Sequence, residues 1–284
     1  MREKEGIALY GATDVGQVRT KNEDSIAYCS HPTEPFAYMV IADGMGGYVG
    51  GGMASQIAIN EIEQQFSNLV SSEFFEYSLE QQESSVYSTA HEVMKASNKK
   101  IIDAKYENPD CSNMGTTAVL VVVLRRFLVV SHIGDSRAYL WTEKGLLQLT
   151  KDHSVVQEMI DAGVINEEEA KVSDVRNHIT RALGVSTDIE AETHAYLLNT
   201  AALLMVCSDG VTEYLNNTDI HEALFNCSEI PDTCNEIIKK ANDSGGKDNI
   251  SIGLMRVNID EITTPSTYTP AIKKEDSDVT IRRW

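Results

Sequence analysis

The segment TAVLVVVLRRFLVVSHIGDSRAYLW, residues 117–141, contains the pattern that decides the fold. Its two apolar stretches, residues 117–124 and Phe127–Ile133, are short, rich in Val and Leu, and separated by two arginines. Stretches of this length joined by two residues are typical of a β-hairpin. Residues 137–141 follow a Gly-Asp-Ser turn and predict a further strand. We therefore expect consecutive antiparallel strands in the centre of the protein.

The rest of the chain mixes strands with helices. Further strands are predicted at Phe36–Ala42 and at residues 203–207 and 249–257, and helices at residues 53–70, 80–105, 219–225 and 232–241. Runs of strands with helices between them favour an α+β fold with a largely antiparallel sheet over a Rossmann-like fold.

Residues 258–284 have a different composition from the rest. They contain few apolar residues, two prolines and scattered charges. Such a segment cannot offset the entropy lost when it becomes ordered. We therefore expect one domain over residues 1–257 and a flexible tail over residues 258–284.

The charge balance excludes several classes of partner. The chain has 24 basic and 43 acidic residues, a formal net charge of −19, which opposes binding to nucleic acid or to anionic lipid. Its apolar runs are far shorter than the roughly 20 residues needed to cross a bilayer. The charged first residues lack the apolar core of a secretory signal. We expect a cytoplasmic protein that binds neither nucleic acid nor membrane.

Four aspartates stand at the ends of predicted strands: Asp43, Asp135, Asp209 and Asp248. One Asp-Gly pair is usually only a turn, but four such carboxylates in a sheet-rich chain could also converge on one spot. Carboxylate oxygens are suited to Mg²⁺ or Mn²⁺. The five cysteines include no C-x-x-C pair and the seven histidines no H-x-x-x-H pair, so we expect no competing site for a softer metal.

A basic residue lies near two acids in the segment RTKNED, residues 19–24. Arg19 could form a structural ion pair with Glu23 or Asp24. Alternatively, Arg19 could bind an oxyanion, because its planar guanidinium matches the geometry of a phosphate group, while the two carboxylates orient metal-bound water.

Eight segments together carry a family resemblance. They are residues 15–25 (VGQVRTKNEDS), 40–47 (VIADGMGG), 115–124 (GTTAVLVVVL), 132–140 (HIGDSRAYL), 149–154 (LTKDHS), 178–184 (HITRALG), 203–215 (LLMVCSDGVTEYL) and 245–252 (GGKDNISI). Their order, over roughly residues 6–257, resembles the bacterial branch of the metal-dependent serine/threonine protein phosphatases of type 2C. The resemblance implies a central antiparallel β-sandwich flanked by helix pairs on both sides, in four layers α-β-β-α.

The resemblance also implies a metal centre with two Mn²⁺ or Mg²⁺ ions per subunit and a third metal site. It assigns Asp43 as the ligand that bridges the two ions, Gly44 as a backbone-carbonyl ligand, Asp209 and Asp248 as further carboxylate ligands, Glu23 and Asp24 as direct or water-mediated ligands, Asp135 with Asp209 as the third-metal site, and Arg19 as the phosphate-binding residue.

The implied reaction is direct hydrolysis of phosphoserine and phosphothreonine by a hydroxide held between the two ions. The implied substrates are phosphorylated proteins, the products of a cognate serine/threonine kinase. An alternative is a phosphatase-like module that binds phosphorylated partners without turnover. Retention of Asp43, Asp209 and Asp248 favours the enzyme.

Residues 154–177 resemble the family's mobile flap, so the flanking His153 and His178 could tune substrate access. Met45 stands where some animal members have a histidine proposed as general acid. Relatives commonly have His at the position of Tyr48 and Glu at that of Gly52. We expect these departures to alter metal affinity or dynamics before they abolish activity.

Overall fold

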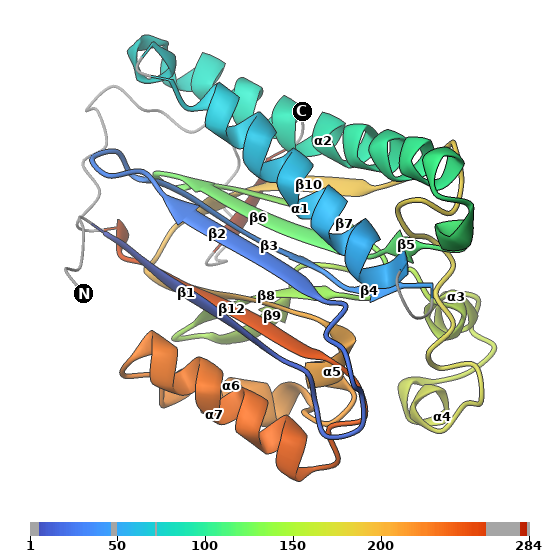
Figure 1. Cartoon of the computed structure of the whole chain (residues 1–284). Helices are drawn as coiled ribbons and strands as arrows, with labels where there is room; N and C mark the ends of the chain where they lie inside the picture. Colours follow the sequence, from blue (N-terminus) through green and yellow to red (C-terminus); the bar gives the residue numbers. More distant parts are fainter. Residues whose placement is uncertain (1–5, 47–49, 72, 260–278, 283–284) are drawn as a thin grey trace.

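Two antiparallel sheets lie face to face in the computed structural model of the chain, which describes residues 6–46, 50–71, 73–259 and 279–282 (Figure 1). The five-stranded sheet has the order β1 (Ile7–Asp14), β12 (Ile250–Val257), β11 (Ala202–Cys207), β8 (Arg137–Thr142), β9 (Gly145–Gln148). The six-stranded sheet has the order β13 (Val279–Arg282), β10 (Glu192–Leu198), β7 (Phe127–Ile133), β6 (Ala118–Leu124), β3 (Phe36–Ala42), β2 (Ser25–Ser30). Two short strands, β4 (Gly44–Met45) and β5 (Gly115–Thr116), pair separately.

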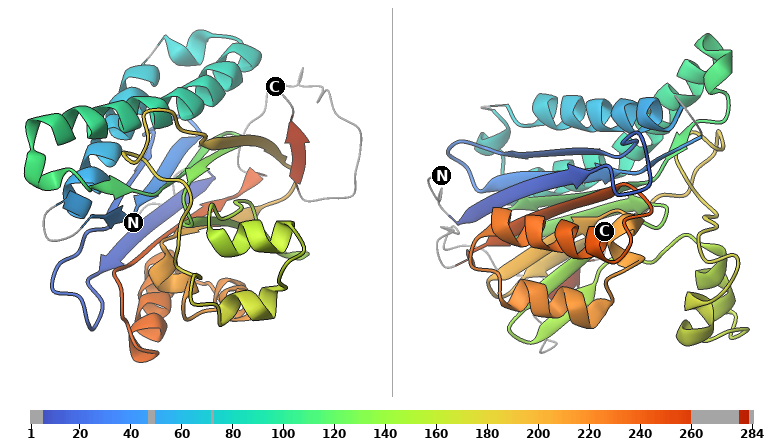
Figure 2. Two further views of the ribbon diagram at one scale, coloured as in Figure 1. Left: turned by 90° about the vertical axis from the view of Figure 1, so that its right-hand side faces the viewer. Right: turned by 60° about the horizontal axis from the view of Figure 1, so that its bottom comes forward.

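Helices cover the outer face of each sheet. The six-stranded sheet packs against α1 (Gly50–Leu69) and α2 (Leu79–Glu107), and the five-stranded sheet against α6 (Asn217–Phe225) and α7 (Ile230–Asp243). Short 3₁₀ turns lie at Phe74–Glu76 and Pro109–Cys111, and α5 (Asp209–Thr212) follows β11. The helices α3 (Val155–Asp161) and α4 (Glu167–Lys171) stand outside the layers at one end of the sandwich (Figure 2). The predicted α+β sandwich with helices on both sides is confirmed.

The central strands are apolar throughout because both of their faces are covered. In β6, Ala118, Leu120 and Val122 face the helices α1 and α2, whereas Val119, Val121 and Val123 face the other sheet. The hairpin to β7 pairs Leu124 with Phe127, as predicted. Arg125 in its turn has φ 56°, the left-handed conformation that two-residue hairpin loops require.

Several strands of the described residues were not predicted from the sequence, namely β1, β2, β4, β5, β9, β10 and β13. The apolar pattern is weak in β1, β9 and β10, because β1 contains glycine and alanine, β9 is only partly buried and β10 begins with Glu-Thr-His. Helix α1 begins at Gly50, three residues before the predicted start. A Cβ atom on Gly51 would lie 2.7 Å from the carbonyl carbon of Gly44, so this first turn needs glycine despite its poor helix propensity.

The expectation of a flexible tail is wrong for Val279–Arg282. This segment forms β13, which pairs with β10 from Leu198↔Val279 to Ala195↔Arg282. Asn199 Nδ2 also donates a hydrogen bond to Thr280 Oγ1 at 3.0 Å. The strand forms because β10 would otherwise leave an unpaired sheet edge. Residues 260–278 lie outside the described residues, and a domain end at residue 257 stays a prediction.

Removal of residues 260–284 should leave turnover nearly unchanged, because none of the candidate site residues lies there. It should lower the melting temperature, because it uncovers the edge of β10. A loss of about 1 kcal/mol would shift the melting temperature by roughly 2–4 °C in a domain of this size. Turnover and thermal unfolding of the full-length and truncated proteins check both statements. A large loss of turnover would show that the domain end is misplaced.

Candidate metal centre

Five acidic residues from distant parts of the chain meet at one end of the sandwich. Each lies at the end of a strand: Asp24 just before β2, Asp43 just after β3, Asp135 between β7 and β8, Asp209 at the start of α5 after β11, and Asp248 just before β12. Each carboxylate that surrounds Asp43 raises its pKa: Asp24, Asp209, Asp135 and Asp248. The structure therefore brings together four predicted strand-end aspartates and the predicted Asp24.

The electrostatics of this cluster oppose full ionisation. Loss of solvation, followed by repulsion from the neighbouring carboxylates, raises the pKa of Asp43 well above its ordinary value. The same two causes raise the pKa of Asp209 to about 8. Loss of solvation is also the largest cause of the raised pKa values of Asp24 and Asp135, each about 6. Protein groups alone therefore do not compensate this concentration of negative charge.

The cluster fits divalent cations. The Oδ1 atoms of Asp24 and Asp209 are buried, and neither has a hydrogen-bond partner among the described residues. A buried carboxylate oxygen without a partner is costly. Its natural partner here is a hard cation, since the donor set consists of carboxylate and backbone oxygens. A bound cation would also favour the ionised carboxylates.

Backbone contacts fix the position of Asp43. Its backbone N–H donates to Thr117 Oγ1 at 3.1 Å, and its carbonyl oxygen accepts from Thr116 Oγ1 at 2.8 Å and from Thr117 N at 2.9 Å. The next residue, Gly44, sits in a tight space, because a Cβ atom there would lie 2.2 Å from the Gly51 carbonyl oxygen and 2.5 Å from that of Glu23. The ADGMGG segment thus brings Asp43, Gly44 and Glu23 close together.

Asn249 holds the loop before β2 against the start of β12. Its Oδ1 accepts from the Glu23 backbone N–H at 2.8 Å, and its Nδ2 donates to the carbonyl oxygens of Val15 at 3.0 Å and Lys21 at 2.9 Å. No role for Asn249 was predicted from the sequence. The feature that could have indicated one is its position directly beside Asp248.

Two serines that the sequence analysis also missed orient Asp24. Its Oδ2 accepts hydrogen bonds from Ser208 Oγ at 2.9 Å and Ser251 Oγ at 2.6 Å. Both serines are fully buried next to apolar strands, where a hydroxyl needs a partner. A small polar residue inside such an apolar run was the sequence signal for this contact.

Arg19 pairs with neither of the adjacent acids considered in the sequence analysis. Its Nη2 donates to Asp248 Oδ2 at 2.8 Å, across 229 positions of the chain. The Arg19 side chain is 49% exposed, so its guanidinium lies at the surface of the carboxylate cluster rather than inside it. This position leaves it accessible to an anion from solvent.

The comparison with known proteins agrees with this geometry. A family model described as Protein phosphatase 2C matches residues 16–241. The chain belongs to the protein phosphatase 2C family. The phosphatase is similar to the serine/threonine phosphatase Stp of Listeria monocytogenes serotype 4b (strain F2365), with 33% identity over 244 residues that cover 86% of this chain and 93% of that protein.

Solved structures show the same fold. The crystal structure of the serine/threonine phosphatase Stp1 from Staphylococcus aureus matches with a TM-score of 0.79 and 29% identity, over 91% of this chain and 98% of Stp1. The catalytic domain of the serine/threonine protein phosphatase PstP, in complex with two manganese ions, matches with a TM-score of 0.72 and 29% identity, over 89% of this chain and 99% of that one. The predicted family and activity are confirmed: the protein is a metal-dependent serine/threonine protein phosphatase, and the alternative of a binding module is not favoured.

Two of the departures from the family pattern, Met45 and Gly52, lie in the described residues near this site. Met45 is in β4, beside Gly44, whereas Tyr48 lies outside the described residues. A Cβ atom on Gly52 would be in ordinary van der Waals contact with Glu23 Cα, at 3.8 Å, so the backbone here does not require glycine. The glycine leaves this position without the carboxylate that relatives commonly have.

The predicted flap, residues 154–177, contains the helices α3 and α4. Ion pairs join it to neighbouring segments, Asp161 to Lys151 at 2.6 Å and Arg176 to Glu213 at 3.9 Å. At its boundaries, His153 is buried and His178 is exposed. Its role as a mobile cover stays a prediction. No helix in the described part of the chain is both long and apolar enough to span a membrane.

Two histidines lie close together in the structure, although the sequence contains no H-x-x-x-H pair. His132, His153 and Glu192 come from three separate segments, and each offers a potential ligand atom within 4.8 Å of the others. Sequence spacing could not reveal this group, because its members are 21 and 39 positions apart.

Proposed function

We propose that the phosphatase holds two divalent cations, Mn²⁺ or Mg²⁺, and a third at Asp135, and hydrolyses phosphoserine and phosphothreonine on the protein substrates of a cognate kinase. The cluster of partly buried carboxylates with raised pKa values carries this proposal. Such a cluster costs stability unless cations occupy it.

Each acidic residue has a proposed part in holding the cations. Asp43 would bind both ions. The Gly44 carbonyl, Asp209 and Asp248 would be further ligands of these ions. Glu23 and Asp24 would bind directly or through water, and Asp135 would act with Asp209 at the third site. Bound cations supply positive charge that lowers the pKa of water and offsets the charge of the phosphate.

Arg19 is the proposed phosphate-binding residue. Its guanidinium is half exposed and reaches Asp248, so it can exchange this carboxylate for phosphate oxygens of similar geometry. Met45 has no proton to donate to the leaving alkoxide, so water or another residue must supply that proton. Arg19 would orient the phosphate.

Arg19→Ala should reduce kcat/KM for p-nitrophenyl phosphate by about 10- to 100-fold, which corresponds to the roughly 1.5–3 kcal/mol of a hydrogen bond to a charged group. Arg19→Lys should recover only part of this loss, because an ammonium cannot make the two parallel contacts of a guanidinium. Steady-state kinetics at saturating Mn²⁺ checks both variants. Wild-type KM and kcat in Arg19→Ala would contradict the proposed role of Arg19.

A turnover assay tests the function itself. Phosphate release from p-nitrophenyl phosphate and from a phosphothreonine peptide should require Mn²⁺ or Mg²⁺ and should stop in excess EDTA. Activity that persists undiminished in excess chelator would contradict the proposed metal chemistry.

We place this activity in the cytoplasm, where the cognate kinase would supply the substrates. All five cysteines are free. Burial raises the pKa of Cys207 and of Cys234 to about 12, so both thiols stay protonated and unreactive. Free cysteines support a reducing compartment.

A further inference from the structure

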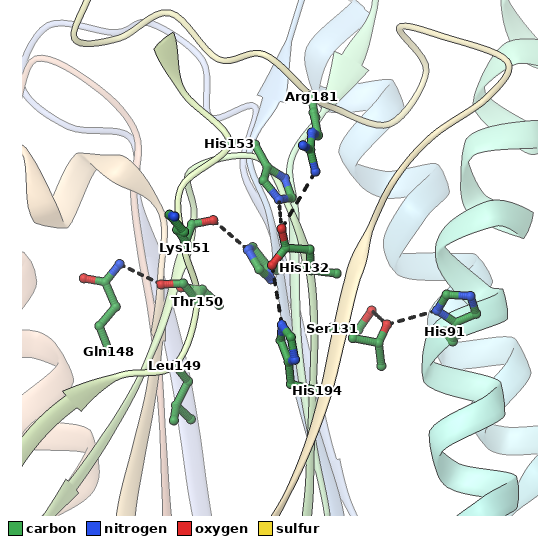
Figure 3. A network of polar contacts seen from close by, with 12 residues as sticks. His91, Ser131, His132, Gln148, Leu149, Thr150, Lys151, His153, Arg181 and His194 are labelled. Atoms are coloured by element: carbon green, nitrogen blue, oxygen red, sulfur yellow. Dashed lines mark hydrogen bonds and ion pairs between the residues drawn. The ribbon is translucent and has the colours of Figure 1, made fainter. Parts of the chain in front are cut away.

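The cluster formed by His132, His153 and Glu192 lies next to the turn that carries Asp135. His132 is in β7, Glu192 is in β10, and His153 immediately precedes the predicted flap (Figure 3). Both histidines are at least nine-tenths buried. Apart from the predicted influence of His153 on substrate access, this cluster has so far no role.

His153 binds Gly134, the residue before Asp135, at two points. The backbone N–H of His153 donates to the Gly134 carbonyl oxygen at 2.9 Å, and its side-chain Nδ1 accepts from the Gly134 N–H at 3.1 Å. Gly134 has φ 103°, a conformation that suits glycine, and a Cβ atom there would lie 2.6 Å from Thr117 Cγ2. His153 therefore satisfies both backbone groups of the residue at which the chain turns toward Asp135.

A second contact joins the same two segments. Arg137, two residues after Asp135, donates to both carboxylate oxygens of Asp152 at 2.8 and 2.7 Å. Since Asp152 directly precedes His153, the turn containing Asp135 is held on both sides by consecutive residues. This arrangement fixes the chain on both sides of Asp135.

Further contacts fix the orientation of the His153 ring. Its Nε2 lies 3.3 Å from Glu192 Oε1, and Glu192 also lies near Arg181 at 3.8 Å and His194 at 3.4 Å. The ring stacks on His132, with centroids 4.8 Å apart and planes 17° apart. The ring is therefore held by its neighbours and not only by its contact with Gly134.

The hydrogen bonds identify which nitrogen of the His153 ring carries the proton. A backbone N–H can only donate, so His153 Nδ1 is unprotonated and the proton of the neutral ring is on Nε2, directed at Glu192. Burial lowers the pKa of His153, which agrees with a neutral ring. A metal at this cluster would need the proton moved to Nδ1, where it would face the Gly134 N–H. This argues against a metal site.

We propose that His153 is a positioning residue for Asp135, acting through the hydrogen bond from the Gly134 N–H to Nδ1. The proposal rests on the proposed function, in which Asp135 contributes to the third cation site. His153 thereby links the cation site to the start of the predicted flap. Its backbone carbonyl also accepts from Thr180 N at 2.8 Å, just after that segment.

Two substitutions distinguish the roles of the two ring nitrogens of His153. In His153→Asn, Oδ1 occupies roughly the place of Nδ1 and can accept from the Gly134 N–H. In His153→Gln, the terminal atoms reach roughly the place of Nε2, which restores the contact with Glu192 but not that with Gly134. A purely structural role would affect both variants through stability alone, so thermal unfolding is measured for each.

The first readout is the amide hydrogen exchange of Gly134 by NMR in the metal-free protein. We expect exchange to be slow in the wild type and in His153→Asn, and roughly tenfold faster in His153→Gln, which loses one hydrogen bond. The second readout is kcat at saturating Mn²⁺. We expect kcat of His153→Asn to be about 10-fold or more above that of His153→Gln, the scale of effect known for residues that hydrogen-bond to metal ligands. Equal exchange and equal kcat in the two variants would overturn the proposal.

Asp135→Asn separates failure of this inference from failure of the proposed function. If Asp135→Asn loses activity while His153→Asn and His153→Gln remain alike, the inference alone is wrong. If Asp135→Asn is fully active, the proposed role of Asp135 is wrong, and the inference fails with it.

Discussion

Asp209→Asn should abolish Mn²⁺-dependent phosphate release and, in the metal-free protein, raise the melting temperature. Asparagine keeps the shape of the side chain but removes its charge. Loss of solvation and repulsion from Asp135, Asp248 and Asp24 make an ionised Asp209 costly in the folded state, and a neutral asparagine removes this cost. We expect activity to fall by more than about 100-fold. Removal of a residue that only hydrogen-bonds to a metal ligand already lowers metal affinity or activity about 10–100-fold.

Asp188→Asn is the matched control for this experiment. Asp188 is exposed in the loop before β10, away from the carboxylate cluster, and the substitution removes the same charge. Activity and melting temperature of this variant should match the wild type. A metal-free Asp209→Asn protein that melts below the wild type would contradict the repulsion argument, and substantial activity would contradict the ligand assignment.

The metal-free phosphatase should lose stability as the pH rises from about 6.5 to 8.5. Folding raises the pKa of Asp209 from 3.8 to about 8, and that of Asp43 also rises. The folded state therefore binds more protons than the unfolded state between these values. This contribution to stability is complete below pH 3.8 and is lost as the pH passes through about 8.

The choice of pH window isolates the carboxylates. Burial lowers the pKa of His132 and His153, so their contribution makes stability rise with pH up to their ordinary pKa of 6.5. Above pH 6.5 the change in stability with pH comes mainly from the aspartates. The melting temperature should fall across the window without metal, and Mg²⁺ or Mn²⁺ should restore it. The slope should be smaller in Asp209→Asn; a metal-free melting temperature that is constant or rising across the window would contradict the raised pKa values.

The sequence predicted the central strands because their burial on both faces leaves few polar positions. In β6 all seven residues are buried, and the short length of this run and its four valines favour a strand over a buried helix. By contrast, β10 starts with Glu192, Thr193 and His194; Glu192 pairs with His153 and Thr193 with Ser131, both on other segments. These polar residues break the apolar pattern from which a strand is predicted, and their contacts with other segments become apparent only in the structure.

The site was predictable to the extent that its residues follow strands directly. Asp43 and Asp209 stand after fully buried strands, so the sheet fixes their positions. Asn249 and His153 act through backbone groups of distant loops, and the path of a loop is not encoded in residue spacing. The resemblance supplied the order of the motifs, and the structure supplied these supporting contacts.

The most direct test of the account is a crystal structure of the phosphatase with Mn²⁺, from anomalous diffraction at the manganese edge. The account predicts two strong peaks among Asp43, Asp209 and Asp248, both contacting Asp43, and a further peak at Asp135. The absence of any manganese peak between Asp43 and Asp209, in a protein that is active with Mn²⁺, would contradict it.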